Sequence, residues 1–265
     1  MEVENNMKTR VLSGLAMVPL LALVYLGGYP LLALCVIIAV IGIKEFYDGF
    51  NAMGIKPCHL IAYASVFVLY LINAAAPGNF QMICAWLAGS IMISSLYMFK
   101  TTERTPADAM ATMVGIIYVI FFSFHVVLVD QTYPVMIWMV LLTAFCTDIF
   151  AYFSGYFFGK HKLCPTLSPK KTIEGAVGGT LGTVICSGIF GYFVVPEIWW
   201  QCLIMGFVAA IFSQFGDLTA SAYKRKMGIK DYGNLIPGHG GIMDRFDSVL
   251  FTAPVIYYYI ALVLN

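Results

Sequence analysis

Charged residues are scarce in this sequence. Only 11% of its 265 residues are Asp, Glu, Lys or Arg, whereas 60% are hydrophobic and the mean hydropathy is +0.84. A water-soluble globular domain needs far more charge on its surface, about 25% of its residues. The composition therefore excludes that class and indicates a polytopic membrane protein.

The chain also lacks a disulfide framework, internal repeats and linkers. Its seven cysteines are odd in number, stand mostly within apolar segments and form no CxxC pair, which argues against both disulfides and a cysteine metal site. No low-complexity tract divides the sequence, so we expect one membrane domain, residues 1–265. The first apolar run has no small-x-small cleavage site followed by a soluble domain and is interpreted as an uncleaved anchor.

Long apolar runs suited to a hydrocarbon core of about 30 Å occupy most of the chain. They predict an all-α, polytopic integral membrane protein with about nine transmembrane helices. The predicted spans are residues 11–28, 30–50, 60–76, 79–99, 107–129, 133–158, 173–195, 198–221 and 247–264.

The distribution of Lys and Arg residues predicts how the spans are oriented in the membrane. All fifteen Lys and Arg residues fall on one side of the nine predicted spans, and the other side has only Asp130 and Glu197. Because cytoplasmic loops carry the excess of Lys and Arg, we expect a cytoplasmic N-terminus and, after nine crossings, a C-terminus outside.

Polar residues gather in residues 213–247, which contain five cations and four carboxylates. As a helix, the start of this stretch would place Ser213, Asp217, Ser221, Lys224 and Arg225 on one face. Asp217 and Lys224 would then lie about 10 Å apart, roughly the span from a bound metal to the far end of a triphosphate. A glycine-rich loop and the Asp244–Asp247 segment follow. These groups are suited to anions and metal ions.

A basic cluster beside an apolar segment can also be only a topology signal. Asp217 argues for more than that, because it follows an apolar segment in which an ionised carboxylate costs a few kcal/mol unless it is paired or hydrated. A topology signal needs no such acid.

These residues also carry a resemblance to a known family. Their order resembles the signature of phosphatidate cytidylyltransferases, also called CDP-diacylglycerol synthases, although many relatives have Glu where this chain has Ala220. The matching positions are Ser221, Lys224, Arg225, Lys230, Asp231, Gly233, Ile236, Pro237, His239, Gly240, Gly241, Asp244, Arg245 and Asp247.

A second polar segment precedes the signature. Asp148 is an acid within an otherwise apolar span, where it could simply hydrogen-bond across a helix interface, and it shares a helix face with Tyr152 and Gly155. No Walker motif is present, because the glycines before Lys160 have the wrong spacing. The pattern here is similar to the segment upstream of the family signature. Its positions are Asp148, Ala151, Tyr152, Gly155, Phe158, Gly159, Lys160, Ser168, Pro169, Lys171, Thr172, Glu174 and Gly175.

The segment from Ser168 to Thr172 predicts a helix start, with Ser168 as the cap and Pro169 in the first turn. Its exposed N–H groups and adjacent lysines would form a seat for phosphate. The glycines that follow predict a smooth face for close helix packing; they are Gly175, Gly178, Gly179 and Gly182.

The resemblance implies the reaction of CTP with phosphatidate to give CDP-diacylglycerol and pyrophosphate. Residues 141–248 would carry a cytosol-facing active site, and residues 1–140 would be mainly scaffold. Asp217, Asp244, Lys224 and Arg225 are the predicted catalytic residues. The predicted substrate-binding residues are Ser168, Lys171, Thr172, Ser221, Lys230, His239, Gly240, Gly241 and Arg245.

The predicted cofactor is Mg²⁺ or another divalent cation, because the candidate ligands are all oxygen donors. Asp217 and Asp244 are the predicted metal ligands, with Asp148 and Asp247 as further candidates. The expected partners are CTP, phosphatidate and the lipid bilayer, with no nucleic acid; a homodimer is left open. The expected location is the bacterial inner membrane.

Two alternatives remain at this point. Acids within spans and glycine-interrupted helices also occur in secondary transporters, although these acids lie at the cytoplasmic end and no inverted repeat is found. Another CDP-linked lipid phosphotransferase is the nearer rival, but its Asp-Gly-x-x-Ala-Arg opening is absent.

Overall fold

The computed structural model describes residues 19–99, 102–238 and 240–264. The chain divides into two compact units. The first comprises residues 1–131 with 226–246, and the second comprises residues 132–225 with 247–265. Two compact units can belong to one membrane domain, so the single-domain interpretation stays a prediction.

The predicted spans from residue 30 onward are confirmed as helices. The described helices long and apolar enough to cross a membrane are Gly28–Ala52, Phe80–Phe99, Pro106–Thr132, Pro134–Phe158, Ile173–Val194 and Pro196–Met227, and two shorter apolar helices are His59–Ala75 and Val249–Leu264. Residues 11–18 of the first predicted run, 11–28, lie outside the described residues, and residues 19–26 are helical. The total of nine and the orientation therefore stay predictions.

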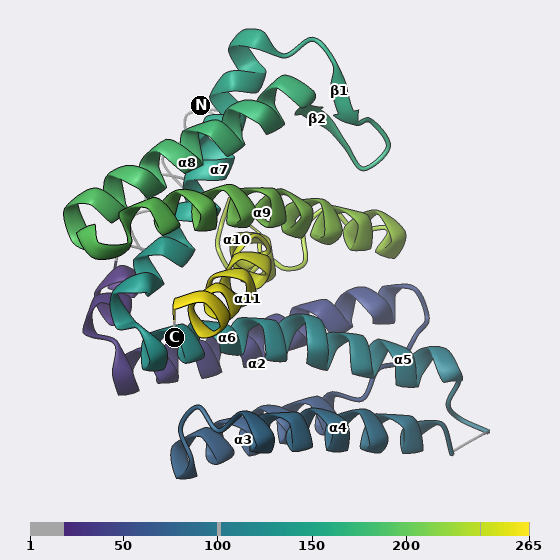
Figure 1. The fold of residues 1–265 in the computed structure, drawn as a ribbon. Helices are drawn as coiled ribbons and strands as arrows, with labels where there is room; N and C mark the ends of the chain where they lie inside the picture. Colours follow the sequence, from purple (N-terminus) through teal and green to yellow (C-terminus); the bar gives the residue numbers. More distant parts are fainter. Residues whose placement is uncertain (1–18, 100–101, 239, 265) are drawn as a thin grey trace. The chain divides into compact units, whose positions relative to one another are not determined.

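Helices build the first unit (Figure 1). Helix α3 packs against α2 and α4, α4 packs against α5, and the π-helical segment η2 continues α5 and packs against α2. The elements are α2 Gly28–Ala52, α3 His59–Ala75, α4 Phe80–Leu96, η1 Tyr97–Phe99, α5 Pro106–Gly115, η2 Ile116–Phe121, α6 Phe122–Thr132, which ends one residue into the second unit, and α10 Met243–Phe246.

The core of the first unit forms where α2 meets α5. Tyr47 is fully buried there, and its hydroxyl donates a 2.7 Å hydrogen bond to the carbonyl oxygen of Thr112. Gly115 leaves the space that the Tyr47 ring fills, because a Cβ at that position would overlap the ring. This polar bond satisfies a hydroxyl that would otherwise be costly to bury.

The buried carboxylate of Asp108 organises the start of α5. It accepts hydrogen bonds from the backbone N–H groups of Thr105 at 2.7 Å and Lys56 at 2.6 Å, and the Thr105 hydroxyl accepts one from the Asp108 N–H. This is a capping box, with Pro106 at the first helical position. Asp108 thus joins two loops through backbone hydrogen bonds.

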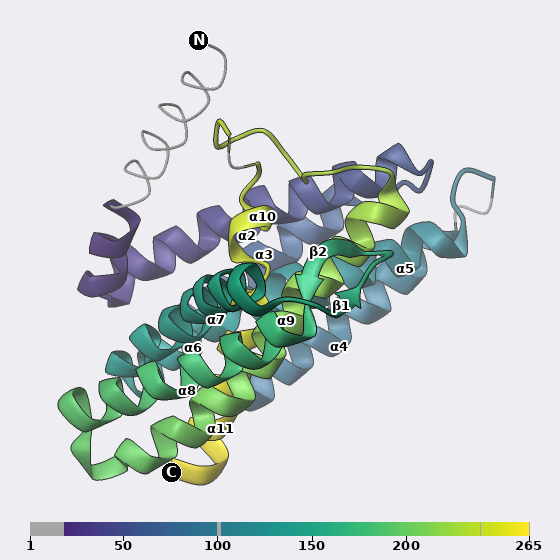
Figure 2. The same cartoon turned by 90° about the horizontal axis from the view of Figure 1, so that it is seen from above.

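The second unit is built on the pair α7 and α8, which pack along their lengths (Figure 2). Helix α11 packs against α7. The elements are η3 Pro134–Met136, α7 Ile137–Phe158, β1 Lys162–Cys164, β2 Ser168–Thr172, α8 Ile173–Val194, η4 Pro196–Ile198, α9 Trp199–Met227, whose last two residues belong to the first unit, α11 Val249–Tyr259 and η5 Ile260–Leu264. The short hairpin β1–β2 is an addition to the predicted all-α fold.

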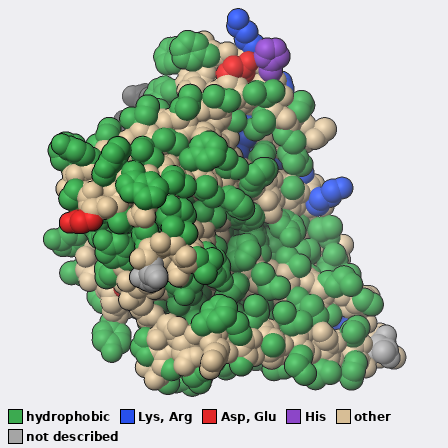
Figure 3. All heavy atoms as spheres, in the orientation of Figure 1, with side chains coloured by type: hydrophobic (Ala, Val, Ile, Leu, Met, Phe, Trp, Pro, Cys, Tyr) green, Lys and Arg blue, Asp and Glu red, His purple; other side chains and the backbone are tan. Residues whose placement is uncertain are grey.

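Glycines bring α7 and α8 close together, as the sequence predicted. A Cβ at Gly179 would lie 2.9 Å from the Thr147 carbonyl oxygen on α7, and one at Gly182 would overlap the Phe150 ring. Close backbone approach through small residues is the usual packing mode of membrane helices. Elsewhere, hydrophobic side chains dominate the face shown in Figure 3, as expected for a surface in contact with lipid.

Candidate active site

The hairpin between α7 and α8 carries the predicted phosphate-binding segment. Strands β1 and β2 are antiparallel, with Lys162 opposite Thr172 and Cys164 opposite Ser168. Glu174, at the start of α8, closes the hairpin: its carboxylate accepts a 3.1 Å hydrogen bond from the Lys160 N–H and lies 2.6 Å from Nδ1 of His161. The hairpin is therefore tied to the helix that follows it.

The predicted helix start at Ser168 is wrong. Residues 168–172 form strand β2, and α8 begins at Ile173 with Thr172 as its N-cap. The Thr172 hydroxyl accepts a 3.1 Å hydrogen bond from the Gly175 N–H. Both Ser168 and Thr172 are residue types that cap helices. Ser168 pairs with Cys164 of β1 and is therefore part of the hairpin. The N-cap of α8 is Thr172, four residues later.

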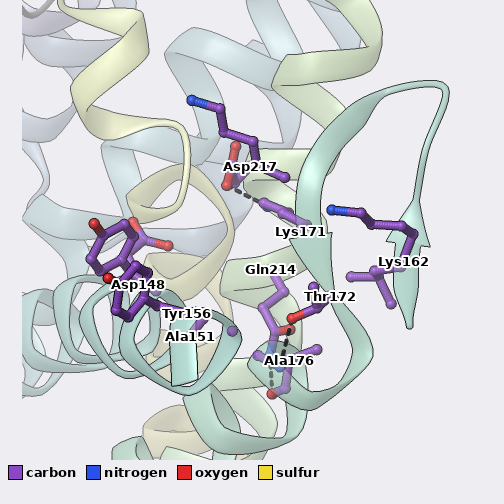
Figure 4. Close-up of a pocket in the computed structure, with 14 residues that line it drawn as sticks. Asp148, Ala151, Tyr156, Lys162, Lys171, Thr172, Ala176, Gln214 and Asp217 are labelled. Atoms are coloured by element: carbon purple, nitrogen blue, oxygen red, sulfur yellow. Dashed lines mark hydrogen bonds and ion pairs between the residues drawn. The ribbon is translucent and has the colours of Figure 1, made fainter. Parts of the chain in front are cut away.

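A cavity of about 520 Å³ lies within the second unit, between α7, the hairpin, α8 and α9. This size is in the range of small-molecule sites. Asp148, Tyr152 and Gly155 all line it from α7, as predicted from their spacing, and Lys171 and Thr172 line it from the hairpin side. Figure 4 shows these walls. Ser168 is not part of the lining.

An ion pair between Lys171 and Asp217 lies in the lining of this cavity (Figure 4). Both side chains are about a quarter exposed, 26% and 27%, so the pair is accessible from the cavity. Ser221, one turn further along α9, donates a 3.4 Å hydrogen bond to Oδ1 of Asp217. The sequence thus predicted correctly that Asp217 and Ser221 share a helix face, but it did not predict that Lys171 would pair with Asp217.

Asp247 is a further buried acid of the second unit. Burial, together with repulsion from Asp217 and Asp148, raises the pKa of its carboxyl to about 7, and Lys224 opposes this shift. Asp247 therefore interacts electrostatically with two other predicted metal-binding acids, Asp217 and Asp148. Such an excess of negative charge is what a bound cation would offset.

The donor set fits a divalent cation in part. Among the described residues, no three His, Cys, Asp or Glu side chains lie close enough together to hold a metal by themselves. Mg²⁺ does not need them, because it commonly binds one or two carboxylates and completes its octahedron with substrate phosphates and water. Asp148 and Asp217, which both line the cavity, provide such a partial set.

The cavity lining also includes residues that the sequence analysis did not single out, among them Lys162 and Gln214. Lys162 contributes from β1, and Gln214 contributes from α9, where its side-chain amide donates a 3.0 Å hydrogen bond to the Thr180 hydroxyl. Gln214 stands three residues before Asp217 on the same helix, and this spacing could have placed it beside the site. Arg225, a predicted catalytic residue, is exposed and its Nε donates a 3.4 Å hydrogen bond to the Leu167 carbonyl oxygen in the hairpin turn.

The remaining predicted residues belong to the first unit. Lys230, Gly240, Gly241, Asp244 and Arg245 lie in or beside the loop that joins α9 to α10. The buried Asp244 accepts hydrogen bonds at its Oδ2 from the N–H groups of Tyr232, at 2.8 Å, and Gly241, at 3.0 Å. His239 lies outside the described residues.

Sequence reasoning missed one acid of this unit. Glu45 of α2 is buried, and its carboxylate accepts hydrogen bonds from the backbone N–H groups of Ile242 and Met243. The signal in the sequence was an acid beside Lys44 and near Asp48, in an otherwise apolar helix. The neighbouring Lys44 and Asp48 form an ion pair with each other, with Nζ of Lys44 2.8 Å from Oδ2 of Asp48.

The fold and this cavity define a membrane protein with a small, charged binding site. The model of the cytidylyltransferase family matches residues 8–263, and the chain belongs to this family. A phosphatidate cytidylyltransferase of Staphylococcus haemolyticus is 31% identical over 256 residues, which cover 94% of this chain and 97% of the relative. One of Bacillus subtilis is 31% identical over 270 residues, covering 97% and 98%.

Proposed function

We propose that this protein is a phosphatidate cytidylyltransferase, which converts CTP and phosphatidate to CDP-diacylglycerol and pyrophosphate. The names of its relatives support the reaction, and family membership favours an enzyme over a transporter. The apolar helices support a membrane environment suited to a lipid substrate.

The observation that carries this proposal is the Lys171–Asp217 pair in the cavity of the second unit. An ion pair that is partly exposed is held only weakly, because solvent screens it. A phosphate can replace the carboxylate beside Lys171, and a cation can replace the ammonium beside Asp217. The pair therefore provides one place for an anion and one for a cation.

The proposed chemistry is a single in-line displacement. A phosphate oxygen of phosphatidate attacks the α-phosphorus of CTP, the new P–O bond forms, and the bond to the β-phosphate breaks, so that pyrophosphate leaves. Lys171 and Lys224 would hold phosphate oxygens by charge-assisted hydrogen bonds. Positioning and charge stabilisation account for most of the catalysis of phosphoryl-group transfers, and no covalent enzyme intermediate is needed.

Asp217 and Asp148 would hold the divalent cation, which when bound offsets negative charge on the phosphates. Asp244 is assigned to the metal by the family signature alone. Its Oδ2 already accepts two backbone hydrogen bonds, which is a loop-shaping role. The assignment of Asp244 is therefore the one that most needs a test.

The bacterial relatives and the cation pattern support a place in the bacterial inner membrane with the site toward the cytosol. In a background without the native cysteines, a membrane-impermeant thiol reagent applied to intact cells should label a cysteine replacing Glu197 and should miss one replacing Lys226. Labelling in the reverse sense would contradict this orientation.

Pyrophosphate release tests the activity itself. Purified protein in lipid–detergent micelles should release pyrophosphate only when CTP, phosphatidate and Mg²⁺ are all present. Omitting each in turn provides the controls. Release that does not need phosphatidate would indicate a nucleotide hydrolase, and no release with all three present would contradict the proposal.

A further inference from the structure

The loop of residues 228–243 in the first unit contains much of the signature but little regular structure. Its backbone turns at Gly228, Gly238 and Gly240, which all have positive φ angles, and an isolated bridge joins Ile236 to Gly240. Glycine adopts such angles at little cost, but it also leaves the unfolded loop many alternatives. Something outside the loop must therefore hold it in one conformation.

Glu45 provides that restraint from α2. Its Oε1 accepts a 3.1 Å hydrogen bond from the Ile242 N–H, and its Oε2 accepts one of 2.9 Å from the Met243 N–H. The two ends are almost two hundred residues apart in sequence, and α10 packs on α2 (Figure 2). Among the described residues, Glu45 forms no salt bridge, and these two N–H groups donate hydrogen bonds that help to stabilise its buried charge.

The loop backbone closes around this carboxylate. A Cβ at Gly233 would lie 2.6 Å from Oε1 of Glu45, and one at Gly241 would be closer still. A side chain at either position would have to push the carboxylate away. Two separate parts of the loop thus depend on the same acid.

Asp244 completes the arrangement. It accepts hydrogen bonds from Tyr232 and Gly241, while Glu45 accepts them from Ile242 and Met243. Between them, two carboxylates bind the N–H groups of three consecutive residues, 241–243, and one distant residue. Hydrogen bonds to a charged acceptor contribute more than neutral ones, about 1.5–3 kcal/mol each.

We infer that Glu45 is a positioning residue for the transfer reaction. It sets the conformation of the loop that presents Lys230, Gly240 and Gly241, which the family signature assigns to substrate binding. Glu45 itself touches no substrate and acts through the backbone. This inference rests on the proposed function, because it concerns the same reaction.

Glu45→Gln is the direct test, since it preserves size but replaces one acceptor oxygen with a donor. Asp108→Asn is a matched control. Asp108 is also a buried carboxylate of the first unit that accepts two backbone hydrogen bonds, from Lys56 and Thr105, and it is outside the signature loop. Both variants would be assayed in lipid–detergent micelles for thermal unfolding and for kcat and KM with each substrate.

Both substitutions should lower the unfolding temperature. Glu45→Gln should also lower kcat/KM by about tenfold or more and raise the KM of CTP or phosphatidate, whereas Asp108→Asn should leave both constants of the folded enzyme within about twofold. A purely structural role would reduce only the active fraction and leave KM unchanged. Kinetics of Glu45→Gln that match those of Asp108→Asn would overturn the inference.

Two further variants keep the test decisive if Glu45→Gln does not fold. Glu45→Asp retains both acceptor oxygens and should recover part of the lost kcat/KM. Gly233→Ala presses a methyl group onto the carboxylate from the loop side and should raise KM as Glu45→Gln does. Wild-type kinetics in Gly233→Ala would contradict the inference. If the wild-type protein shows no release dependent on CTP and phosphatidate, the proposed function fails and the inference with it.

Discussion

The acids that the family signature and the cavity bring into question have different partners in the two units. In the second unit, Asp217 forms an ion pair with Lys171 in the lining of a cavity. In the first unit, Glu45 and Asp244 accept hydrogen bonds from the backbone of one loop. A carboxylate paired with a lysine side chain can exchange that partner for a ligand. A carboxylate bound to backbone N–H groups instead fixes the conformation of the chain. The first kind of acid should therefore affect rate alone, and the second kind should affect both rate and stability.

Asp217→Asn should give the largest effect. The change removes a unit of negative charge where a dication would bind, and we expect kcat/KM to fall at least about a hundredfold. Stability should change little, because a partly exposed ion pair contributes only about 0–1 kcal/mol. Asp48→Asn, in the exposed pair with Lys44, is the matched control and should keep wild-type kinetics. Wild-type turnover of Asp217→Asn at saturating Mg²⁺ would remove Asp217 from the metal site.

Asp244 can be examined with two substitutions that separate its two roles. If the metal assignment holds, Asp244→Asn should lose at least about a hundredfold in rate while remaining stable, because the amide oxygen can still accept both backbone hydrogen bonds. Asp244→Ala should in addition lose about 3 kcal/mol of stability as those N–H groups lose their partner. An active Asp244→Asn beside an unstable Asp244→Ala would show that this acid only shapes the loop.

Lys171→Ala should have a smaller effect, lowering kcat/KM by about tenfold or more through weaker phosphate binding. The fold should persist, because the ion pair that Lys171 forms is with the partly exposed Asp217. Steady-state kinetics with each substrate varied in turn would show which KM rises. Lys56→Ala, an exposed lysine of the first unit, is the control. Unchanged kinetics in Lys171→Ala would exclude the hairpin from the site.

The smallest effect should come from the helix cap. Thr172→Ala removes the hydroxyl that accepts the Gly175 N–H and should cost about 1 kcal/mol of stability, whereas Ser168→Ala in the strand should cost less. Thermal unfolding of the two variants measures the difference. Equal destabilisation, or a larger loss in Ser168→Ala, would contradict the assigned start of α8.

The sequence predicted the features that repeat along a helix. Apolar runs located the spans from residue 30 onward, and the glycines of α8 predicted its close packing on α7. Helical spacing also predicted the face shared by Asp217 and Ser221 and the face shared by Asp148, Tyr152 and Gly155. Each of these rests on local geometry, which residue spacing encodes directly.

What the sequence did not predict depends on partners far along the chain. Ser168 and Thr172 are both plausible caps, and pairing of β2 with β1 decides between them. The partners of Glu45 are backbone N–H groups of Ile242 and Met243, which every residue except proline has. No residue type marks such a contact, so only the folded chain shows it.

Transfer of label from [α-³²P]CTP is the most direct test of the claim that the charges of the second-unit cavity carry the reaction. With phosphatidate and Mg²⁺ present, the wild-type protein should move the label into the lipid-extractable fraction as CDP-diacylglycerol, and Asp217→Asn should move almost none. Label that stays in the aqueous phase with the wild-type protein, or that reaches the lipid equally well with Asp217→Asn, would contradict the account.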